Sequence, residues 1–252
     1  MKNLIRVLLG ISVAIVTLWS FEVPDAVGFQ KPELARIFFW HFPCAMLSTA
    51  LLFLGAWFSF KFLRSNDLAD DVRAEAANSL GMTFAVLTMI TGILFSQVQW
   101  GTWWQWDPRQ TSFLLVLLIY LAYFALRSAF SDAERRATNA AGYALAAILP
   151  ALFLIFVFPR LPQVAQASFH PTQSIMQGQI KGAYAYVVSI LLVTMSTLAV
   201  WLYRARVKAG VFLLTLEKNN ERLETGGGHP TPTGVVRPVS VSVEDRKEAQ
   251  GS

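Results

Sequence analysis

Charged residues are scarce in this sequence. Only 15% of its 252 residues are Asp, Glu, Lys or Arg, compared with about 25% in an average soluble domain, while 54% are hydrophobic. This balance excludes an ordinary soluble domain and is typical of a membrane protein. At about 20 apolar residues per membrane-spanning helix, a chain of this length holds six spans and leaves little for a second folded domain.

Cysteine and histidine are scarcer still. The one cysteine, Cys44, excludes an intramolecular disulfide, a Cys-x-x-Cys-His haem attachment motif and a four-cysteine metal site. Cys44 follows His41 by about one helical turn, but an unpaired cysteine in an apolar run usually packs as a small hydrophobic residue, and we expect that here. The three histidines are His41, His170 and His229.

Long apolar runs predict an all-α integral membrane protein with six transmembrane helices. None of the runs alternates as a strand does, and each is long enough to cross the hydrocarbon with its backbone groups bonded within the segment. The first run follows Lys2 and Arg6 and resembles a signal peptide, but Pro24 lies where cleavage requires a small residue, so we interpret it as a retained anchor. The runs cover residues 4–21, 34–60, 80–99, 111–127, 140–158 and 182–203.

Basic residues in the connections predict the orientation, because cytoplasmic loops of membrane proteins carry an excess of Lys and Arg. With the amino terminus in the cytoplasm, 16 of the 21 basic residues lie inside. We therefore expect both termini in the cytoplasm, and we attribute the net charge of +5 to this asymmetry rather than to nucleic-acid binding. The five basic residues outside are Lys31, Arg36, Arg109, Arg160 and Lys181.

This topology divides the chain into a membrane domain, residues 1–210, and a cytoplasmic tail, residues 211–252. From about residue 219 the tail contains three consecutive glycines and scattered Pro, Ser and Val with no helical period, so we expect it to be flexible. The external connections span about residues 22–33, 98–110 and 159–181. The unusual residues of the chain fall in or beside these three connections.

The second external connection is rich in tryptophan. Four of the eight tryptophans, Trp100, Trp103, Trp104 and Trp106, lie within seven residues, followed by Asp107, Pro108 and Arg109. Indoles favour the membrane interface, so an aromatic belt is one interpretation. The other is a broad π surface for a large flat ligand that is part apolar and part anionic. Composition alone leaves both open, and Asp107 could equally cap the next helix, pair with Arg109 or orient a partner.

Two histidines lie on the same predicted side as this loop. His41 is about seven residues into the second apolar run, where an ionisable group is costly unless it faces a cavity or a partner. His170 lies in the third external connection, whereas His229 lies in the tail, where we expect a solvated residue. A haem iron takes an axial ligand on each face, so His41 and His170 could clamp a porphyrin between them. Arg109, Arg36, Arg160 or Lys181 could then pair with its propionates.

The sequence around these residues resembles a known family. Residues 100–112, Trp-Gly-Thr-Trp-Trp-Gln-Trp-Asp-Pro-Arg-Gln-Thr-Ser, look like the tryptophan-rich WWD signature of haem-handling proteins. Residues 36–43, Arg-Ile-Phe-Phe-Trp-His-Phe-Pro, are similar to the stretch around the first haem-ligating histidine of the CcmC-type haem exporters, and His170 occupies the loop position of the second. The resemblance covers about residues 30–205.

The resemblance implies a function in the maturation of c-type cytochromes. It implies non-covalent binding of haem b (iron protoporphyrin IX) at the periplasmic face of the bacterial cytoplasmic membrane, through His41, His170, the four tryptophans, Asp107, Arg109 and Arg36. It further implies delivery to a periplasmic haem chaperone, together with the subunits of an ATP-binding cassette transporter. In this interpretation the chain is a carrier in the lipid bilayer and not an enzyme.

Two other functions compete with the carrier. Larger members of the WWD family ligate haem to apocytochrome thiols, but this chain has no large external domain to hold an acceptor. A b-type subunit of a quinone-linked complex usually places paired histidines on facing helices within the membrane, whereas His170 lies in a loop that contains proline. The carrier is therefore our expectation.

Overall fold

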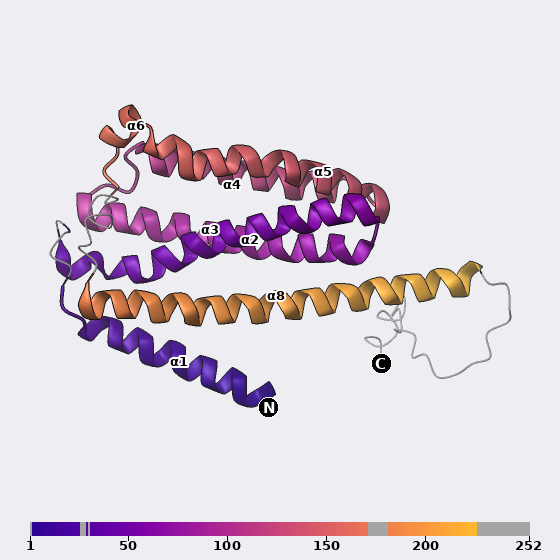
Figure 1. Cartoon of the computed structure of the whole chain (residues 1–252), viewed down its shortest axis with the longest axis horizontal. Helices are drawn as coiled ribbons and strands as arrows, with labels where there is room; N and C mark the ends of the chain where they lie inside the picture. Colours follow the sequence, from indigo (N-terminus) through magenta and orange to yellow (C-terminus); the bar gives the residue numbers. More distant parts are fainter. Residues whose placement is uncertain (1, 26–28, 30, 171–180, 226–252) are drawn as a thin grey trace, which may run out of the picture. The chain divides into compact units, whose positions relative to one another are not determined.

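The computed structural model describes residues 2–25, 29, 31–170 and 181–225, and within these residues every regular element is a helix (Figure 1). The predicted all-α fold is confirmed. The elements in chain order are α1 (Lys2–Glu22), η1 (Pro32–Ile37), α2 (Phe38–Ser65), α3 (Leu68–Trp100), α4 (Pro108–Ser128), α5 (Ala133–Leu152), η2 (Phe153–Val157), η3 (Phe158–Arg160), α6 (Pro162–Gln166) and α8 (Gly182–Thr225).

Five stretches of the described chain are long and apolar enough to cross a membrane. They contain η1 with α2, then α3, α4, α5 with η2 and η3, and most of α8. The remaining predicted span corresponds to α1, whose apolar segment Val7–Glu22 is shorter than the other five. The chain is therefore a multi-pass membrane protein, while the side of the membrane that each end faces stays a prediction.

Short turns between the helices use residue types suited to their positions. Asp67, Asp107 and Asp132 each accept a hydrogen bond from a backbone N–H in the first turn of the following helix, which satisfies a donor that has no partner within the helix. Helix α3 ends at Gly101, whose φ of 80° is accessible to glycine without steric cost. Along the chain from α2 to α5, each helix runs antiparallel to the one before it (Figure 1).

The described helices pack through four apolar clusters. One joins α2, α4 and α5, a second joins α2, α3 and α8, and a third joins α1, the beginning of α2 and the beginning of α8. A fourth joins the end of α2 to the first half of α5. Small residues allow close approach, as is common between membrane helices. A Cβ added to Gly55 of α2 would collide with the side chain of Asn78 on α3, so only glycine fits there. Cys44 is buried in the second cluster, which confirms the prediction that it packs as a hydrophobic residue.

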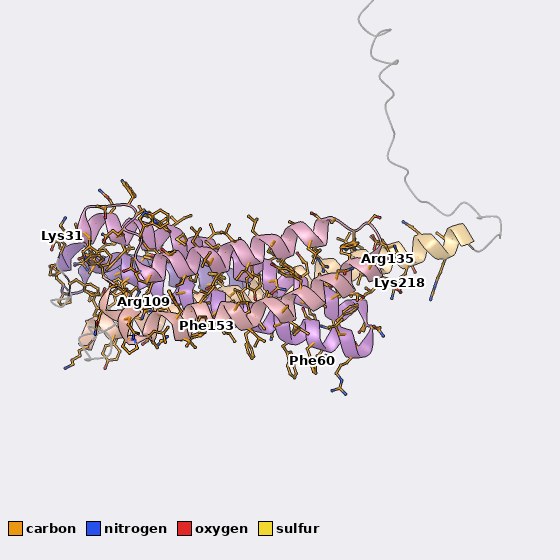
Figure 2. The ribbon with its side chains drawn as sticks, turned by 90° about the horizontal axis from the view of Figure 1, so that it is seen from above. Lys31, Phe60, Arg109, Arg135, Phe153 and Lys218 are labelled. Carbon is orange, nitrogen blue, oxygen red and sulfur yellow. The ribbon has the colours of Figure 1, made fainter. Side chains whose placement is uncertain are left out.

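Two ends of this bundle can be distinguished. The site end comprises the beginnings of α2 and α4, the ends of α3 and α5, and the connections between them; the far end comprises the opposite helix termini. Figure 2 shows Lys31 and Arg109 toward the site end, and Phe60 and Arg135 toward the far end. The described parts of the three connections predicted to be external, residues 22–33, 98–110 and 159–181, all belong to the site end.

Ion pairs hold the far end together. Arg127 of α4 donates two hydrogen bonds to Asp71 of α3, at 2.7 and 2.6 Å, and both side chains are largely buried. Asp70 accepts hydrogen bonds from Arg73 at 2.7 Å and from Lys61 of α2 at 3.3 Å. These pairs connect α2, α3 and α4.

The chain divides into two compact units, residues 1–214 and 215–252, and α8 continues across the division to Thr225. The sequence had placed this division at residue 210. Residues 211–225, which the sequence assigned to the flexible tail, are helical and continue α8. Residues 226–252 lie outside the described residues, so the flexibility of that part stays a prediction, and so does the solvated position of His229.

Candidate functional site

A cavity of about 190 Å³ lies at the site end of the bundle. Its walls come from α2, α3, the tryptophan-rich loop, α4, and the segment from η2 to His170. Both His41 and His170 line it, although they are far apart in sequence. The other lining residues are mostly apolar, with a few polar groups. Those used below are Gly92, Phe95, Trp100, Asp107 and Arg109.

His41 stands in the first turn of α2, and α3 fixes the orientation of its ring. Its Nδ1 lies 3.0 Å from Oγ1 of Thr91, and that hydroxyl donates its proton to a backbone carbonyl of α3, with Leu87 O at 2.7 Å. A hydroxyl has one proton to donate, so toward the histidine it acts as the acceptor. This arrangement favours the tautomer in which Nδ1 carries the hydrogen and Nε2 keeps the lone pair that binds metals.

Gly92 of α3 has no side chain, which leaves room for the His41 ring. A Cβ added to Gly92 would lie 3.2 Å from Cε1 of His41, which is closer than ordinary van der Waals contact. The imidazole thus rests against bare backbone on one side, with its Nδ1 bound to the neighbouring Thr91. This contact and the hydrogen bond restrict the rotamers open to His41.

His170 lies at the end of the loop that follows α6. Its backbone N–H donates to Oγ of Ser168 at 3.2 Å. Burial, followed by the neighbouring charges of Arg109, His41 and Arg160, lowers the pKa of the His170 imidazole to about 3. The ring is therefore neutral at physiological pH, which is the form that ligates a metal.

Asp107 is buried between the tryptophan-rich loop and the His170 loop. Its Oδ1 accepts from the backbone N–H of Arg109 at 2.8 Å and so caps α4. Its Oδ2 accepts from the hydroxyl of Ser168 at 2.9 Å and from the backbone N–H of Phe169 at 2.6 Å. Of the three roles left open by the sequence, the cap is confirmed, and the carboxylate also holds a loop 61 residues away.

The four clustered tryptophans occupy different environments. Trp100 ends α3, lines the cavity, and makes an edge contact with Phe95 at 5.6 Å between ring centroids. Trp103 and Trp106 are 57% and 75% exposed. Trp104 is half-buried and contacts the Trp106 ring edge-on at 5.8 Å. The loop thus gives one indole to the cavity and presents two on the surface.

Comparison with known proteins identifies the family. The model of the CcmC family, described as heme exporter protein C, matches residues 1–221. This chain belongs to the heme exporter protein C family. It is 33% identical over 119 residues to heme exporter protein C of Paracoccus denitrificans, covering 47% of this chain and 48% of that protein.

Other relatives of the same name align over similar lengths. The protein of Bradyrhizobium diazoefficiens is 37% identical over 122 residues, covering 48% of this chain and 46% of the relative. The protein of Escherichia coli K12 is 33% identical over 134 residues, covering 52% and 54%. The chain therefore matches about half the length of these curated relatives.

The structure brings together some of the predicted site residues of this family member and separates others. Residues on the cavity wall are His41, His170, Trp100, Asp107 and Arg109. Trp103, Trp104 and Trp106 are not on the wall, and neither is Arg36. The Arg36 guanidinium donates instead to the carbonyls of Ser20 and Val23 and to Asp25, which ties the end of α1 to η1.

Sequence reasoning missed three residues that orient the predicted ligands. Thr91 and Gly92 lie about 50 residues from His41, and no local pattern connects them to it. Ser168 precedes His170 by two residues, a spacing at which a serine hydroxyl often accepts from the backbone, so its contact with His170 N could have been predicted. Its contact with Asp107 could not.

Proposed function

We propose that this chain binds haem non-covalently at the site end and delivers it to a periplasmic haem chaperone during c-type cytochrome maturation. His41 and His170 are the proposed axial ligands of the iron. The observation that carries the proposal is that the two histidines, from different helices and loops, line the same largely apolar cavity.

The chemistry of these histidines suits haem iron. Both imidazoles suit metal ligation as neutral lone-pair donors. The bonding of His41 favours a lone pair on Nε2, and the lowered pKa of His170 keeps its ring neutral. A porphyrin brings four nitrogens of its own, so the protein needs to supply only axial ligands. Among the described residues no group of three or more His, Cys, Asp or Glu could hold a bare metal ion, which favours a ligand that carries its own macrocycle.

The size of the cavity favours a partly exposed cargo. Pockets that enclose a whole ligand usually measure about 300–1,000 Å³, whereas this one measures about 190 Å³. One edge of a porphyrin would enter, and the exposed indoles of Trp103 and Trp106 would cover part of the remainder. Arg109, on the cavity wall, would pair with a propionate. A haem held in this way stays within reach of an acceptor protein.

The proposed partners follow from the family. The chain would work with the subunits of an ATP-binding cassette transporter, with its site end on the periplasmic side of the inner membrane. The single cysteine is buried, so the chain has no thiol placed to bind haem covalently. Release to the chaperone then requires only the exchange of axial ligands and the loss of stacking contacts.

The absorption spectrum of the purified protein tests the ligand assignment. The wild-type chain should show six-coordinate, low-spin haem, and His41→Ala or His170→Ala should give a five-coordinate or haem-free sample. His229→Ala is the matched control and should leave the spectrum unchanged. Unaltered spectra in both of the first two variants would remove the assignment.

Replacing the surface indoles tests haem delivery separately from haem retention. Trp103→Ala combined with Trp106→Ala should weaken haem binding and abolish co-purification with the chaperone, while membrane insertion is preserved. Trp57, on α2, is 54% exposed and supplies a matched control, because Trp57→Ala removes an equally exposed indole away from the cavity. If the tryptophan-rich loop is only an interfacial anchor, the double variant will insert poorly, yet each inserted molecule will bind and transfer haem normally.

A further inference from the structure

The Asp107 carboxylate is fully engaged by donors from two separate segments. One donor is the Arg109 N–H at the beginning of α4, and the others are the Ser168 hydroxyl and the Phe169 N–H from the segment that carries His170. The residue is 7% exposed, so this bonding occurs away from water. Hydrogen bonds to a carboxylate are shorter and stronger than those between neutral groups, and burial increases the cost of losing them.

Ser168 extends this bonding to the histidine. Its hydroxyl donates to Asp107 and, through the same oxygen, accepts from the backbone N–H of His170 at 3.2 Å. Together with the bond to Phe169, this fixes the two residues before His170 and the histidine's own backbone nitrogen relative to the first turn of α4. Asp107 thereby fixes the backbone position from which the His170 side chain extends.

We propose that Asp107 is a positioning residue that holds His170 in place as a haem ligand, acting through Ser168 and Phe169 rather than by contact with haem. This inference rests on the proposed function. It also explains why an acidic residue stands on the wall of a cavity proposed to bind an anionic ligand: its charge is satisfied by N–H and O–H donors and is not presented to a propionate. The bond that caps α4 uses Oδ1, whereas the shorter bonds to Ser168 and Phe169 use Oδ2. Asn and Ser lack this second acceptor oxygen, so neither is equivalent to Asp here.

One variant separates the positioning role from the helix cap. In Asp107→Ser the hydroxyl still caps α4 as well as Asp does, but it is shorter and cannot also accept from Phe169. The same change at Asp132, which caps α5 by accepting from Arg135 N–H at 2.8 Å, is the matched control at the far end. Ser168→Ala removes the hydroxyl bonds but leaves the Phe169 bond, so its effect should be smaller than that of Asp107→Ser.

The first measurement needs no haem. Hydrogen exchange of the haem-free, full-length protein in detergent should show the backbone amides of Phe169 and His170 exchanging about tenfold faster or more in Asp107→Ser, since a charge-assisted bond to Phe169 is lost. Asp132→Ser should leave these two amides unchanged. Equal exchange in the wild type and Asp107→Ser would overturn the proposal whether or not the chain binds haem.

The second measurement links the loop to the iron. Asp107→Ser should bind haem about 10- to 100-fold more weakly, as is usual when an outer-shell partner of a metal ligand is removed, and should shift from a six-coordinate to a five-coordinate spectrum. Added imidazole should restore the six-coordinate spectrum in Asp107→Ser and in His170→Ala alike. Faster amide exchange with an unchanged haem spectrum would overturn the positioning role.

The two proposals fail in different ways. If His170→Ala leaves the spectrum of bound haem unchanged, the ligand assignment is wrong and the positioning role toward iron is overturned with it. If His170→Ala alters the spectrum and Asp107→Ser does not, the proposed function stands and this inference alone is overturned.

Discussion

The two ends of the bundle hold their buried carboxylates in different ways. At the far end, the buried Asp71 and Asp70 pair directly with Arg127 and Arg73. At the site end, the buried Asp107 is bound by uncharged N–H and O–H donors, while Arg36 binds two backbone carbonyls and the more exposed Asp25. Within the described residues, Arg109 has no ion pair and lies on the cavity wall.

This difference matches two different demands. Direct pairing neutralises charge and joins helices, which serves stability. Because neutral N–H and O–H donors bind the Asp107 carboxylate, the charge of the nearby Arg109 remains available for a ligand. The ion pairs of the far end therefore hold the helices together, whereas the arrangement at the site end suits the ligand binding that we propose. The comparison predicts that far-end variants change stability without changing ligand binding, and that site-end variants do the reverse.

The largest effect should come from breaking the buried far-end pair. Arg127→Ala leaves the Asp71 carboxylate buried without its partner, which costs about 3–5 kcal/mol of the free energy of unfolding. Thermal or denaturant unfolding of the protein in detergent measures the loss, and the haem spectrum of the folded fraction should match that of the wild type. Arg206→Ala is the control, because its partner Glu75 lies 3.8 Å away and both side chains are substantially exposed. There we expect a change below about 1 kcal/mol.

A smaller effect is expected at Thr91, where ligand binding should change and stability should not. Thr91→Val keeps the shape of the side chain but removes the acceptor for Nδ1 of His41, so the tautomer with a free Nε2 lone pair is no longer selected. Haem affinity should fall about 10- to 100-fold. Thr91→Ser restores the hydroxyl and should restore most of the affinity. Equal haem affinity in the Val and Ser variants would contradict this role.

The smallest effect is a contrast between two glycines. A Cβ on Gly142 of α5 meets nothing within 4 Å, so Gly142→Ala should stabilise the helix by about 0.5–1 kcal/mol. Gly92→Ala makes the same backbone gain but places a methyl group 3.2 Å from His41, which must move by a few tenths of an ångström. Haem titration should therefore show weaker binding for Gly92→Ala alone. If both variants bind haem as the wild type does, the ring of His41 is not held against α3.

Much of the fold could be predicted because the bilayer imposes it. Apolar runs of sufficient length must form helices, since no water is present to satisfy the backbone. Each predicted run lies within observed helical residues, although α3 begins earlier, at Leu68, and α8 continues further, to Thr225. Aspartates at the predicted turns also cap α3, α4 and α5 as their residue type indicates. These features depend on neighbours within a few residues, so they can be read along the chain.

The interior of the site could be predicted only in part. His41, His170 and the tryptophan-rich loop stood out because histidine is scarce and tryptophan is clustered. Arg36 also stood out as a basic residue on the predicted external side, but the structure bonds it to the end of α1. The packing of α1 against η1 decided its partners, because it brings the carbonyls of Ser20 and Val23 within reach of the guanidinium.

The sequence by itself determined that this chain is a helical membrane protein with its unusual residues gathered in the connections of one end. Tertiary structure alone decided that His41 and His170 share a cavity, that Thr91 orients one histidine, and that Asp107 fixes the segment carrying the other. The physical reason is the separation of the interacting residues along the sequence. Burial in lipid and helix capping depend on neighbouring residues, whereas a hydrogen bond between residues 50 or more positions apart forms only after the helices have packed.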